Sequence, residues 1–318
     1  MHGLIVYKLT VQSKNQSGSM AIYSIRDLEK LTGIKAHTIR IWEQRYGIVT
    51  PARTHTNIRY YTDDHLRHLF NVAILNRNGV KISKLAKMTP NEVAELSSEL
   101  TQTRGDNNSQ IEALTLAMID LDESAFETVY GTYVQERGFE KAMMELIYPF
   151  LDKLQLLWFT STVNPVQEKF IIHLIRNKII SAIDQLPIVP AKSGRPTVFI
   201  YATETEPQEL PFLYLQYLIR VRRIRGIYLG NSVSLSELRE ICQKVHPDYV
   251  YTILHEPIPR QTIQGYVDQA VNCIGNGQLL LTGAQLFITP VNLPPTSRVL
   301  NGLPDTIQFL DELQMNFR

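Results

Sequence analysis

A short segment near the N-terminus carries side chains that suit hydrogen bonding to the edges of DNA bases. The segment AHTIRIWEQRY follows a turn at Thr32-Gly33 and ends at Gly47. If it is the second helix of a helix-turn-helix, its first residues enter the major groove and face the base edges. The polar residues around this helix start are Lys35, His37, Thr38 and Arg40.

Helix signals around this segment predict the helix-turn-helix itself. Ser24, followed three residues later by Asp27, forms a capping box that starts a short helix ending near Leu31. Gly47 is a typical residue just beyond a helix end. The isoleucines of this region are expected to pack in the core: Ile34, Ile39 and Ile41.

A short hairpin is predicted next, in TPARTHTNIRYYTDDH. Its first half is turn-like, IRYY is a short strand, and Thr62 caps another helix. A strand pair beside a helix-turn-helix is a wing, whose arginines and tyrosines suit phosphate oxygens. The candidates are Arg53, Arg59, Tyr60 and Tyr61. A second capping box, from Thr89 to Glu92, starts one more helix.

The run GIKAHTIRIWEQRYGIVTPARTHTNIRYYTDDHL closely resembles the winged-helix domain of MerR-type transcription regulators. The match spans roughly residues 22–90. The spelling HTIRIWEQRYGI is nearest to the branch of the light-sensing, cobalamin-dependent repressors of carotenoid genes and the curli regulators. Asn57-Ile58 departs from the Gly-Tyr that most members carry in the wing turn.

The resemblance implies double-stranded DNA as the partner, with contacts from Arg40, Arg45, Arg59 and Tyr60 or Tyr61. It also implies a homodimer, or a higher homo-oligomer, on a pseudo-palindromic operator, and RNA polymerase is an additional expected partner. Glu43 is expected to pair with a nearby arginine, because a carboxylate near phosphates is unfavourable. Trp42 either packs in the core or contacts a phosphate through its indole N–H.

Helical periodicity continues through residues 111–186, after a polar segment at 103–110 that is expected to be a linker. Asp122 and Asn164 are expected to cap two of four helices, which predicts a four-helix bundle. In the cobalamin-sensing relatives, a tryptophan of this bundle and a later Glu-His pair cover the upper face of cobalamin. This sequence has Trp158, Glu168 and Lys169 at those positions, so lysine replaces the histidine.

Alternating strand-like and helical runs after residue 191 predict a doubly wound parallel sheet. Their order resembles the cobalamin-binding Rossmann-like domain. That family places a cobalt-binding histidine, followed by a glycine, after the first strand. Gln208 and Pro211 stand at those two positions here, and Thr282-Gly283 replaces a usual Gly-Gly after a later strand. A carboxamide is a poor donor for cobalt, so cobalamin binding is expected to be lost.

The sequence shows no motif for catalysis, phosphate binding or zinc binding. No phosphate-binding glycine motif, zinc-type Cys/His spacing or convergent catalytic set is present, so neither an enzyme nor a metal site is expected. His255-Glu256 at a strand end either lines a pocket or lies in a surface loop, and the loop is expected. Cys242 and Cys273 are expected to be buried free thiols of a cytoplasmic protein. No apolar run reaches membrane-spanning length.

The basic residues are concentrated in the part of the chain that carries the predicted DNA-binding motifs. Residues 20–90 carry 12 lysines and arginines against five acidic residues, although the whole chain has a net charge of only +1. The expected fold is mainly α plus α/β. Its predicted parts are a disordered tail or extended start (1–19), a winged helix-turn-helix (20–103), a helical bundle (104–190) and a Rossmann-like domain (191–318).

Three functional hypotheses are compatible with this sequence. The first is a DNA-binding transcription regulator whose C-terminal domain senses or oligomerises without cobalamin. The second is a cobalamin-dependent sensor of light or vitamin B12 that binds the corrin without histidine. The third, a corrinoid carrier of a methyltransferase or mutase, would need the missing histidine and would lack the winged helix.

Overall fold

The computed structural model describes residues 23–53, 59–104, 107–159, 163–191, 194–206, 208–258, 262–289 and 291–316. By its internal contacts the chain divides into two compact units, which meet in sequence between Ile175 and Arg176. The predicted tail at residues 1–19 lies outside the described residues. The predicted domain boundaries stay predictions: the one after residue 103 falls inside a compact unit, and helix α10 (Pro165–Asp184) is shared by both units.

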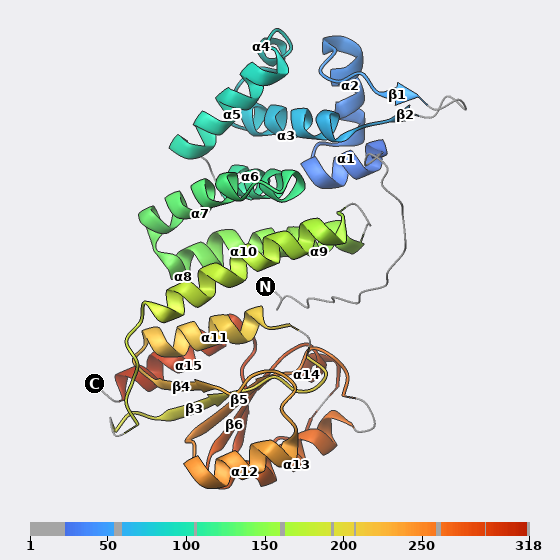
Figure 1. The fold of residues 1–318 in the computed structure, drawn as a ribbon. Coiled ribbons are helices and arrows are strands. Elements are labelled where there is room, and N and C mark those ends of the chain that lie inside the picture. Colours follow the sequence, from blue (N-terminus) through green and yellow to red (C-terminus); the bar gives the residue numbers. More distant parts are fainter. Residues whose placement is uncertain are drawn as a thin grey trace. The chain divides into compact units, whose positions relative to one another are not determined.

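The N-terminal unit begins with a helix-turn-helix and a two-stranded hairpin (Figure 1). Its elements are α1 (Ile25–Thr32), α2 (Ala36–Tyr46), β1 (Ala52–Arg53), β2 (Arg59–Tyr60), α3 (Asp63–Arg77), α4 (Ile82–Leu85) and α5 (Pro90–Arg104). The capping box that opens α1 is confirmed, because Ser24 Oγ accepts the Asp27 N–H at 3.3 Å and the Asp27 carboxylate accepts the Ser24 N–H at 2.8 Å. Such a cap stabilises a helix by about 1 kcal/mol.

A bundle of four helical stretches completes this unit. They are α6 (Asn107–Asp120), α7 (Glu123–Arg137), a continuous run of α8 (Phe139–Lys141), the π-helical segment η1 (Ala142–Ile147) and α9 (Tyr148–Phe159), and finally α10. The predicted caps are confirmed: the Asp122 carboxylate accepts the Ala125 N–H at 3.0 Å, and the Asn164 side-chain oxygen accepts the Val166 N–H at 2.9 Å.

The expected linker at residues 103–110 is wrong. Its described residues are helical, in the end of α5 and the start of α6. Ser109 and Gln110 are buried, and Asn78, the residue that follows α3, donates a hydrogen bond to Ser109 Oγ at 3.0 Å. Tertiary contacts therefore order a segment whose polar composition alone favours a loop.

The C-terminal unit is a five-stranded parallel sheet with the order β4-β3-β5-β6-β7. Its elements are β3 (Thr197–Ile200), α11 (Leu210–Val221), β4 (Arg225–Tyr228), α12 (Leu235–Val245), β5 (Tyr249–Ile253), α13 (Ile263–Ile274), β6 (Gln278–Thr282), α14 (Gln285–Ile288), β7 (Ser297–Val299) and α15 (Leu303–Met315). Helices α11 and α15 cover one face, and α12 and α13 the other (Figure 1). The predicted doubly wound sheet is confirmed, although α14, β7 and α15 were not predicted from the sequence.

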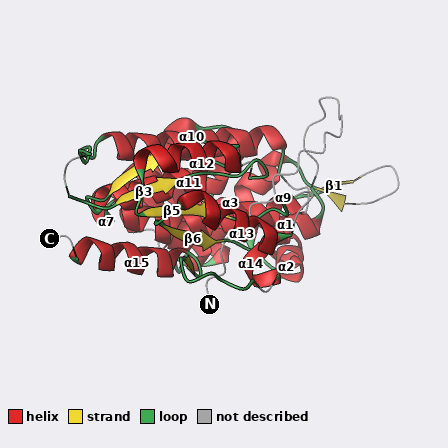
Figure 2. Ribbon diagram, turned by 90° about the horizontal axis from the view of Figure 1, so that it is seen from below, coloured by secondary structure: helices red, strands yellow, loops and turns green. Residues whose placement is uncertain are grey.

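Strands β3, β5 and β6 lie side by side in the middle of this sheet (Figure 2). Their inward side chains, including Phe199, Val250 and Leu279, are fully buried in one apolar cluster. The chain leaves β3 for β4 on one side and later returns to β5 on the other, so β3 and β5 flank the point where the strand order reverses. Ligands of such sheets bind outside the carboxyl ends of the strands at this point.

Two further expectations concern the two cysteines, which lie on helices α12 and α13, and the presence of membrane-spanning helices. Cys242 and Cys273 are buried free thiols, as predicted. Within the described residues, no helix has the length and apolarity that a membrane crossing requires.

Candidate nucleic-acid interface

Helix α1 fixes the start of α2 through one carboxylate. Glu29 accepts hydrogen bonds from the Ala36 N–H and from Lys35 Nζ, both at 3.0 Å. The bond from Lys35, followed by that from Ala36, lowers the pKa of Glu29. Gly33 between the helices adopts φ +70°, a left-handed conformation that favours glycine. The tight turn therefore holds α2 at a defined angle.

One face of α2 packs into the core of the unit. Ile34 and Ile39 are buried, as predicted, and so is Trp42. For Trp42 the structure thus favours the packing alternative. Helical spacing places Ile39 and Trp42 three residues apart on the same face, which leaves the opposite face toward solvent.

The opposite face of α2 is exposed over its whole length. Its residues follow the spacing i, i+3, i+4, i+7, i+8: His37, Arg40, Ile41, Gln44 and Arg45. We call these five residues the α2 face. The burial expected for Ile41 is wrong, because this side chain is 44% exposed. Ile41 lies about 200° from Ile39 around the helix, so the two cannot pack against the same core.

The α2 face contains three of the DNA-contacting residues that the sequence predicts, His37, Arg40 and Arg45, together with two that it does not, Ile41 and Gln44. Within the described residues, the structure gives no hydrogen bond or ion pair to the side chains of Arg40, Gln44 and Arg45. Their donors are therefore available to a ligand. Sequence reasoning missed Gln44 and misplaced Ile41, although the same spacing rule would have found both. Of the predicted residues, Lys35 lies exposed at the start of α2, and Thr38 is half-buried beside His37.

The wing lies next to α2 and is tied to it through Glu43. Ala52 pairs with Tyr60 and Arg53 with Arg59 in the antiparallel hairpin. The predicted pairing of Glu43 is confirmed, because its carboxylate accepts a hydrogen bond from Arg59 Nε at 3.3 Å. The wing residues 54–58, including the unusual Asn57-Ile58, lie outside the described residues.

The DNA contact predicted for Tyr61 is wrong. Tyr61 is fully buried, its backbone bridges that of Tyr23, and its hydroxyl donates to the Glu43 carboxylate at 3.4 Å. Tyr60, one residue earlier in the extended backbone, points to the other side and is half-buried. Arg53 is exposed and Arg59 half-buried, so the wing keeps three of its four predicted contact residues accessible.

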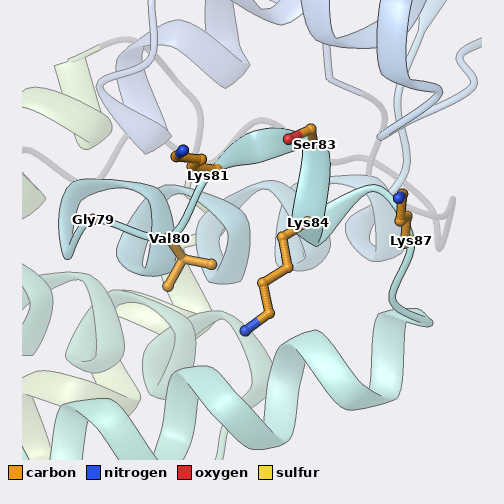
Figure 3. A pocket seen from close by; sticks show the side chains of 6 residues that line it. All are labelled: Gly79, Val80, Lys81, Ser83, Lys84 and Lys87. Atoms are coloured by element: carbon orange, nitrogen blue, oxygen red, sulfur yellow. The ribbon is translucent and has the colours of Figure 1, made fainter.

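A second basic surface, which the sequence analysis did not single out, surrounds α4. A hollow of about 460 Å³ is lined by Gly79, Val80, Lys81, Ser83, Lys84 and Lys87 (Figure 3). The three lysines are exposed and recur at intervals of three residues. This spacing is the signal by which the sequence could have revealed the surface. Lysine ammonium groups and a serine hydroxyl suit phosphate oxygens.

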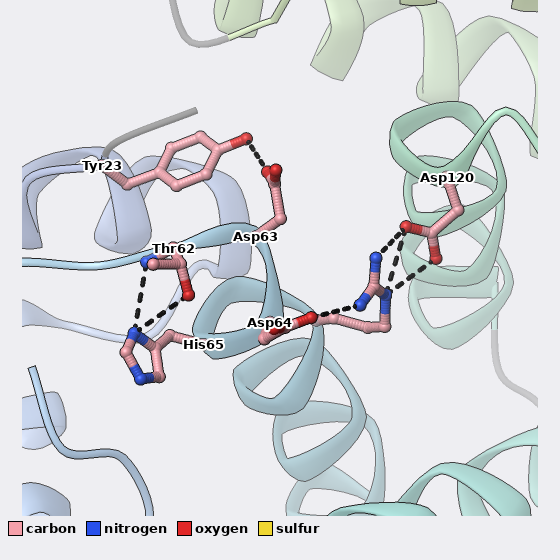
Figure 4. A network of polar contacts seen from close by, with 7 residues as sticks. Tyr23, Thr62, Asp63, Asp64, His65 and Asp120 are labelled. Atoms are coloured by element: carbon pink, nitrogen blue, oxygen red, sulfur yellow. Dashed lines mark hydrogen bonds and ion pairs between the residues drawn. The ribbon is translucent and has the colours of Figure 1, made fainter. Parts of the chain in front are cut away.

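The winged helix is joined to the bundle by a polar network at the start of α3 (Figure 4). The Arg67 guanidinium bonds to Asp64 at 2.8 Å and to Asp120 of α6 at 2.6 Å. Tyr23 donates to Asp63 at 2.7 Å. At the other end of α3, Arg77 forms an ion pair with the buried Glu112 of α6.

Lys153 of α9 extends this junction with a nearly buried ammonium group. Its Nζ lies 5.2 Å from the centre of the Phe70 ring on α3. Burial, with a smaller contribution from the nearby Arg77 charge, lowers the pKa of Lys153 to about 7. Winged helix and bundle thus share a packed and hydrogen-bonded boundary.

The predicted cofactor residues are divided between the two compact units. Trp158, whose side chain is outside the described part, belongs to α9; Glu168 and Lys169 belong to α10. Glu168 is buried, which raises its pKa, and Lys169 is exposed. Gln208, Thr282 and Gly283 belong to the C-terminal unit, and the structure brings the last two to the carboxyl end of β6.

At the carboxyl ends of β5 and β6 the backbones approach closely. Gly283 has φ +126°, and a Cβ added there would lie 2.3 Å from the Leu254 carbonyl oxygen. Only glycine fits this position. The neighbouring Thr282 is buried, and its hydroxyl has no hydrogen-bond partner among the described residues.

Glu206 follows β3 and links it to the segment that follows β5, and sequence reasoning missed this role. The residue is buried, and its Oε1 accepts the N–H of His255 at 2.5 Å and of Glu256 at 2.8 Å. Both donors converge on one oxygen, which leaves Oε2 free to carry a proton. Burial raises the pKa of Glu206 to about 7, although the two N–H groups oppose that shift.

The surface loop expected for His255 is wrong. The residue is buried, its Nδ1 accepts the Ala284 N–H at 3.3 Å, and its carbonyl accepts a bond from the Gln285 side chain at 3.0 Å. Burial lowers the pKa of His255 to about 4, so the imidazole is neutral at pH 7. We call Glu206, His255, Thr282 and Gly283 the sheet edge. Within the described residues, no group of His, Cys, Asp and Glu side chains could hold a metal ion.

Comparison with known proteins gives a family match for the first part of the N-terminal unit. Residues 23–92 match the model of the MerR HTH family regulatory protein. The HTH-type transcriptional repressor CarH of Myxococcus xanthus is 26% identical over 234 residues, which cover 72% of this chain and 77% of CarH. The repressor CarA of the same organism is 24% identical over 71% of this chain and 74% of its own.

Two further matches are partial or distant. The HTH-type transcriptional regulator MlrA of Escherichia coli is 30% identical over 79 residues, 25% of this chain and 32% of MlrA. Among solved structures, the monomethylamine corrinoid protein of Methanosarcina barkeri covers 65% of this chain and all of its own, with a TM-score of 0.49 and 9% identity. The expected resemblance to MerR-type regulators is confirmed by the family match and by CarH and CarA.

Proposed function

We propose that this chain, which is a MerR-type helix-turn-helix transcription regulator, reads its operator through the α2 face. The observation that carries this proposal is the row of exposed side chains from His37 to Arg45 on one side of a helix whose other side is buried. Arginine donates two hydrogen bonds to guanine and glutamine pairs with adenine, so this face has the chemistry of direct base readout.

The phosphate contacts are assigned to two flanking basic surfaces. One is the wing, with Arg53, Arg59 and Tyr60. The other is the hollow at α4, with Lys81, Lys84 and Lys87 (Figure 3). Arg59 already pairs with Glu43, so its contact with a phosphate would share or replace that bond. Phosphate contacts of this kind set the position of the protein on the duplex and make affinity depend on salt.

The assembly and the reaction class follow from the same proposal. The protein binds a pseudo-palindromic operator as a homodimer and acts on RNA polymerase at promoters. It is a cytoplasmic protein and not an enzyme. The regulatory part of this proposal is supported by the curated relatives, which are named as transcriptional repressors and regulators. A dimer on a two-fold operator would place two α2 helices in successive major grooves, about 34 Å apart.

The C-terminal unit is proposed to work without cobalamin. Gln208 and the sheet edge do not fit that group well: Gln208 offers a carboxamide where an imidazole would bind cobalt, and Glu206 already binds the backbone N–H groups beyond the carboxyl end of β5. Incubation of the full-length protein with adenosylcobalamin in the dark, followed by gel filtration, should leave no red chromophore on the protein. A retained, light-labile chromophore would instead support a cobalamin-dependent sensor.

Selection from random duplex DNA tests the DNA-binding proposal. The full-length protein should enrich one sequence with two-fold symmetry and bind it at least about 10³-fold more tightly than unrelated DNA at physiological salt. Equal affinity for selected and unrelated duplexes would contradict sequence-specific binding. Sedimentation of the complex with the selected duplex gives its stoichiometry, which should be two chains per operator.

A further inference from the structure

The α2 face includes one apolar side chain among polar ones. Ile41 is 44% exposed, and it is the one large apolar residue of the winged helix that is exposed among the side chains described in residues 23–97. It directly follows Arg40 and lies one helical turn from His37, Gln44 and Arg45. Nearly half of this side chain is thus left uncovered by the protein itself, among basic and polar neighbours.

The chemistry of the major groove supplies a partner for such a side chain. Thymine presents a C5 methyl group there, and an apolar side chain that contacts it distinguishes thymine from the other bases. Isoleucine suits this contact because a β-branched residue in a helix has one strongly preferred χ1 rotamer. Its methyl groups are thus held in place before DNA binds, and little rotamer entropy is lost on binding.

The neighbours of Ile41 favour DNA over a protein partner. A protein-docking surface would present several adjoining apolar residues, but Ile41 is surrounded by His37, Arg40, Gln44 and Arg45. The guanidinium and carboxamide groups have no internal partners within the described residues, and burial against an apolar protein surface would leave them unsatisfied. Against base edges and phosphates the same groups find acceptors.

We propose that Ile41 determines part of the operator sequence by contacting the C5 methyl group of one thymine in each half-site. This inference rests on the proposed function, because it requires that α2 enters the major groove. It goes beyond that function in assigning one base and one atom of that base to one side chain.

The experiment combines a change in the protein with removal of a single methyl group from the DNA. The full-length protein first selects its operator, and each thymine of one half-site is then replaced in turn by deoxyuridine, which lacks only the C5 methyl. Affinities are measured by fluorescence anisotropy for the parent, for Ile41→Ala and for Ile180→Ala. Ile180 is a matched control, since it is a helical isoleucine of α10 that is 37% exposed.

One thymine should stand out in this comparison. Its replacement should weaken binding of the parent and of Ile180→Ala by about fourfold, which is the value of one buried methyl group at about 0.8 kcal/mol. The same replacement should leave binding of Ile41→Ala unchanged. Arg40→Ala, although weaker in binding, should still respond to the loss of that methyl.

Several results would overturn the inference. They are a half-site without any methyl-sensitive thymine, equal sensitivity of the parent and Ile41→Ala at every thymine, or a change of oligomer mass in Ile41→Ala that shows a protein contact instead. Failure of the proposed function is separate, since a parent that selects no operator would contradict both. Ile41 is exposed, so Ile41→Ala should melt at the same temperature as the parent, and circular dichroism checks this.

Discussion

The α2 face and the sheet edge differ in whether their polar groups have hydrogen-bond partners within the protein. On the α2 face, Arg40, Gln44 and Arg45 project from a capped helix and have no internal partner within the described residues. At the sheet edge, Glu206 accepts two backbone N–H groups and His255 accepts a third. The first region is thus open to a ligand. In the second, a ligand would have to replace existing bonds to reach these backbone N–H groups, although the buried Thr282 hydroxyl has no partner among the described residues.

This difference shows why position in a fold is not sufficient to assign a binding site. The sheet edge lies where ligands of doubly wound sheets usually bind. However, a buried donor that is already satisfied contributes little to binding a new acceptor, because one hydrogen bond is exchanged for another. The α2 face exchanges only water, so each new bond to a base or phosphate adds to affinity and specificity.

The largest expected effect tests the close approach at the sheet edge. Gly283→Ala should destabilise the protein by about 3 kcal/mol or more, because the new Cβ meets the Leu254 backbone and the backbone conformation is also strained. Gly230→Ala is the control, since Gly230 has φ +100° but open space around it, and should cost only about 1 kcal/mol. Urea unfolding measures both, and equal effects would contradict the importance of the close approach.

The next effect concerns the two N–H groups that Glu206 satisfies. Glu206→Ala should reduce the free energy of unfolding by about 2 kcal/mol, since it leaves two backbone donors unpaired at a largely buried position. Glu206→Gln should retain most of this stability because its carbonyl oxygen can accept both N–H groups. Neither change should alter affinity for operator DNA. A loss of DNA affinity without a loss of folding would show that the sheet edge and the α2 face are coupled.

The pH dependence of stability tests whether Glu206 is protonated in the folded protein. The raised pKa of Glu206, about 7 against about 4.5 when unfolded, means that the folded protein favours the protonated acid. Its contribution to stability is therefore fully present below about pH 4.5 and is lost as the pH rises through 7. The stability of Glu206→Gln relative to the parent should increase by about 2 kcal/mol from pH 5 to pH 8.

The comparison with Glu206→Gln is needed because His255 responds in the opposite direction. Its lowered pKa gives stability that is present above about pH 6.5 and is lost as the pH falls toward 4. This contribution is common to the parent and the variant, and it cancels in their difference. A difference that stays constant between pH 5 and pH 8 would show that Glu206 is ionised throughout.

The smallest expected effect concerns the hollow at α4. Lys84→Ala should weaken binding to operator and to unrelated DNA by the same few-fold factor and should reduce the slope of log affinity against log salt by about 1. Lys244→Ala on α12 is the control and should change neither. Anisotropy titrations at several salt concentrations give the slopes. A specific loss for the operator alone would mean that Lys84 contacts a base rather than a phosphate.

Local signals in the sequence predicted most of the helices and their order. The capping boxes at Ser24, Thr89 and Asn164, together with glycine at helix ends, fix helix starts and stops through contacts between near neighbours in the chain. The prediction failed at residues 107–110, where packing of Ser109 against α3 outweighs polar composition. It also failed for Ile41, because three isoleucines were assigned to one core without applying the helical period.

The two candidate sites also differ in how far they could be predicted from the sequence. The α2 face was largely predictable, because all its residues come from one helix. The contact of Glu206 with His255 joins residues 49 positions apart, and it exists only because the parallel sheet places the ends of β3 and β5 side by side. Tyr61 was misassigned because alternation along a strand leaves only one of two adjacent tyrosines accessible, and the sequence did not say which.

The affinity of Arg40→Ala for the selected operator tests the central claim most directly. The account predicts a loss of about 5- to 150-fold at moderate salt, corresponding to about 1–3 kcal/mol for one base-contacting arginine, with less discrimination at one base pair. Arg239→Ala, an exposed arginine of α12, should bind as tightly as the parent. If Arg40→Ala binds the operator as tightly as Arg239→Ala does, the α2 face is not the surface that reads DNA.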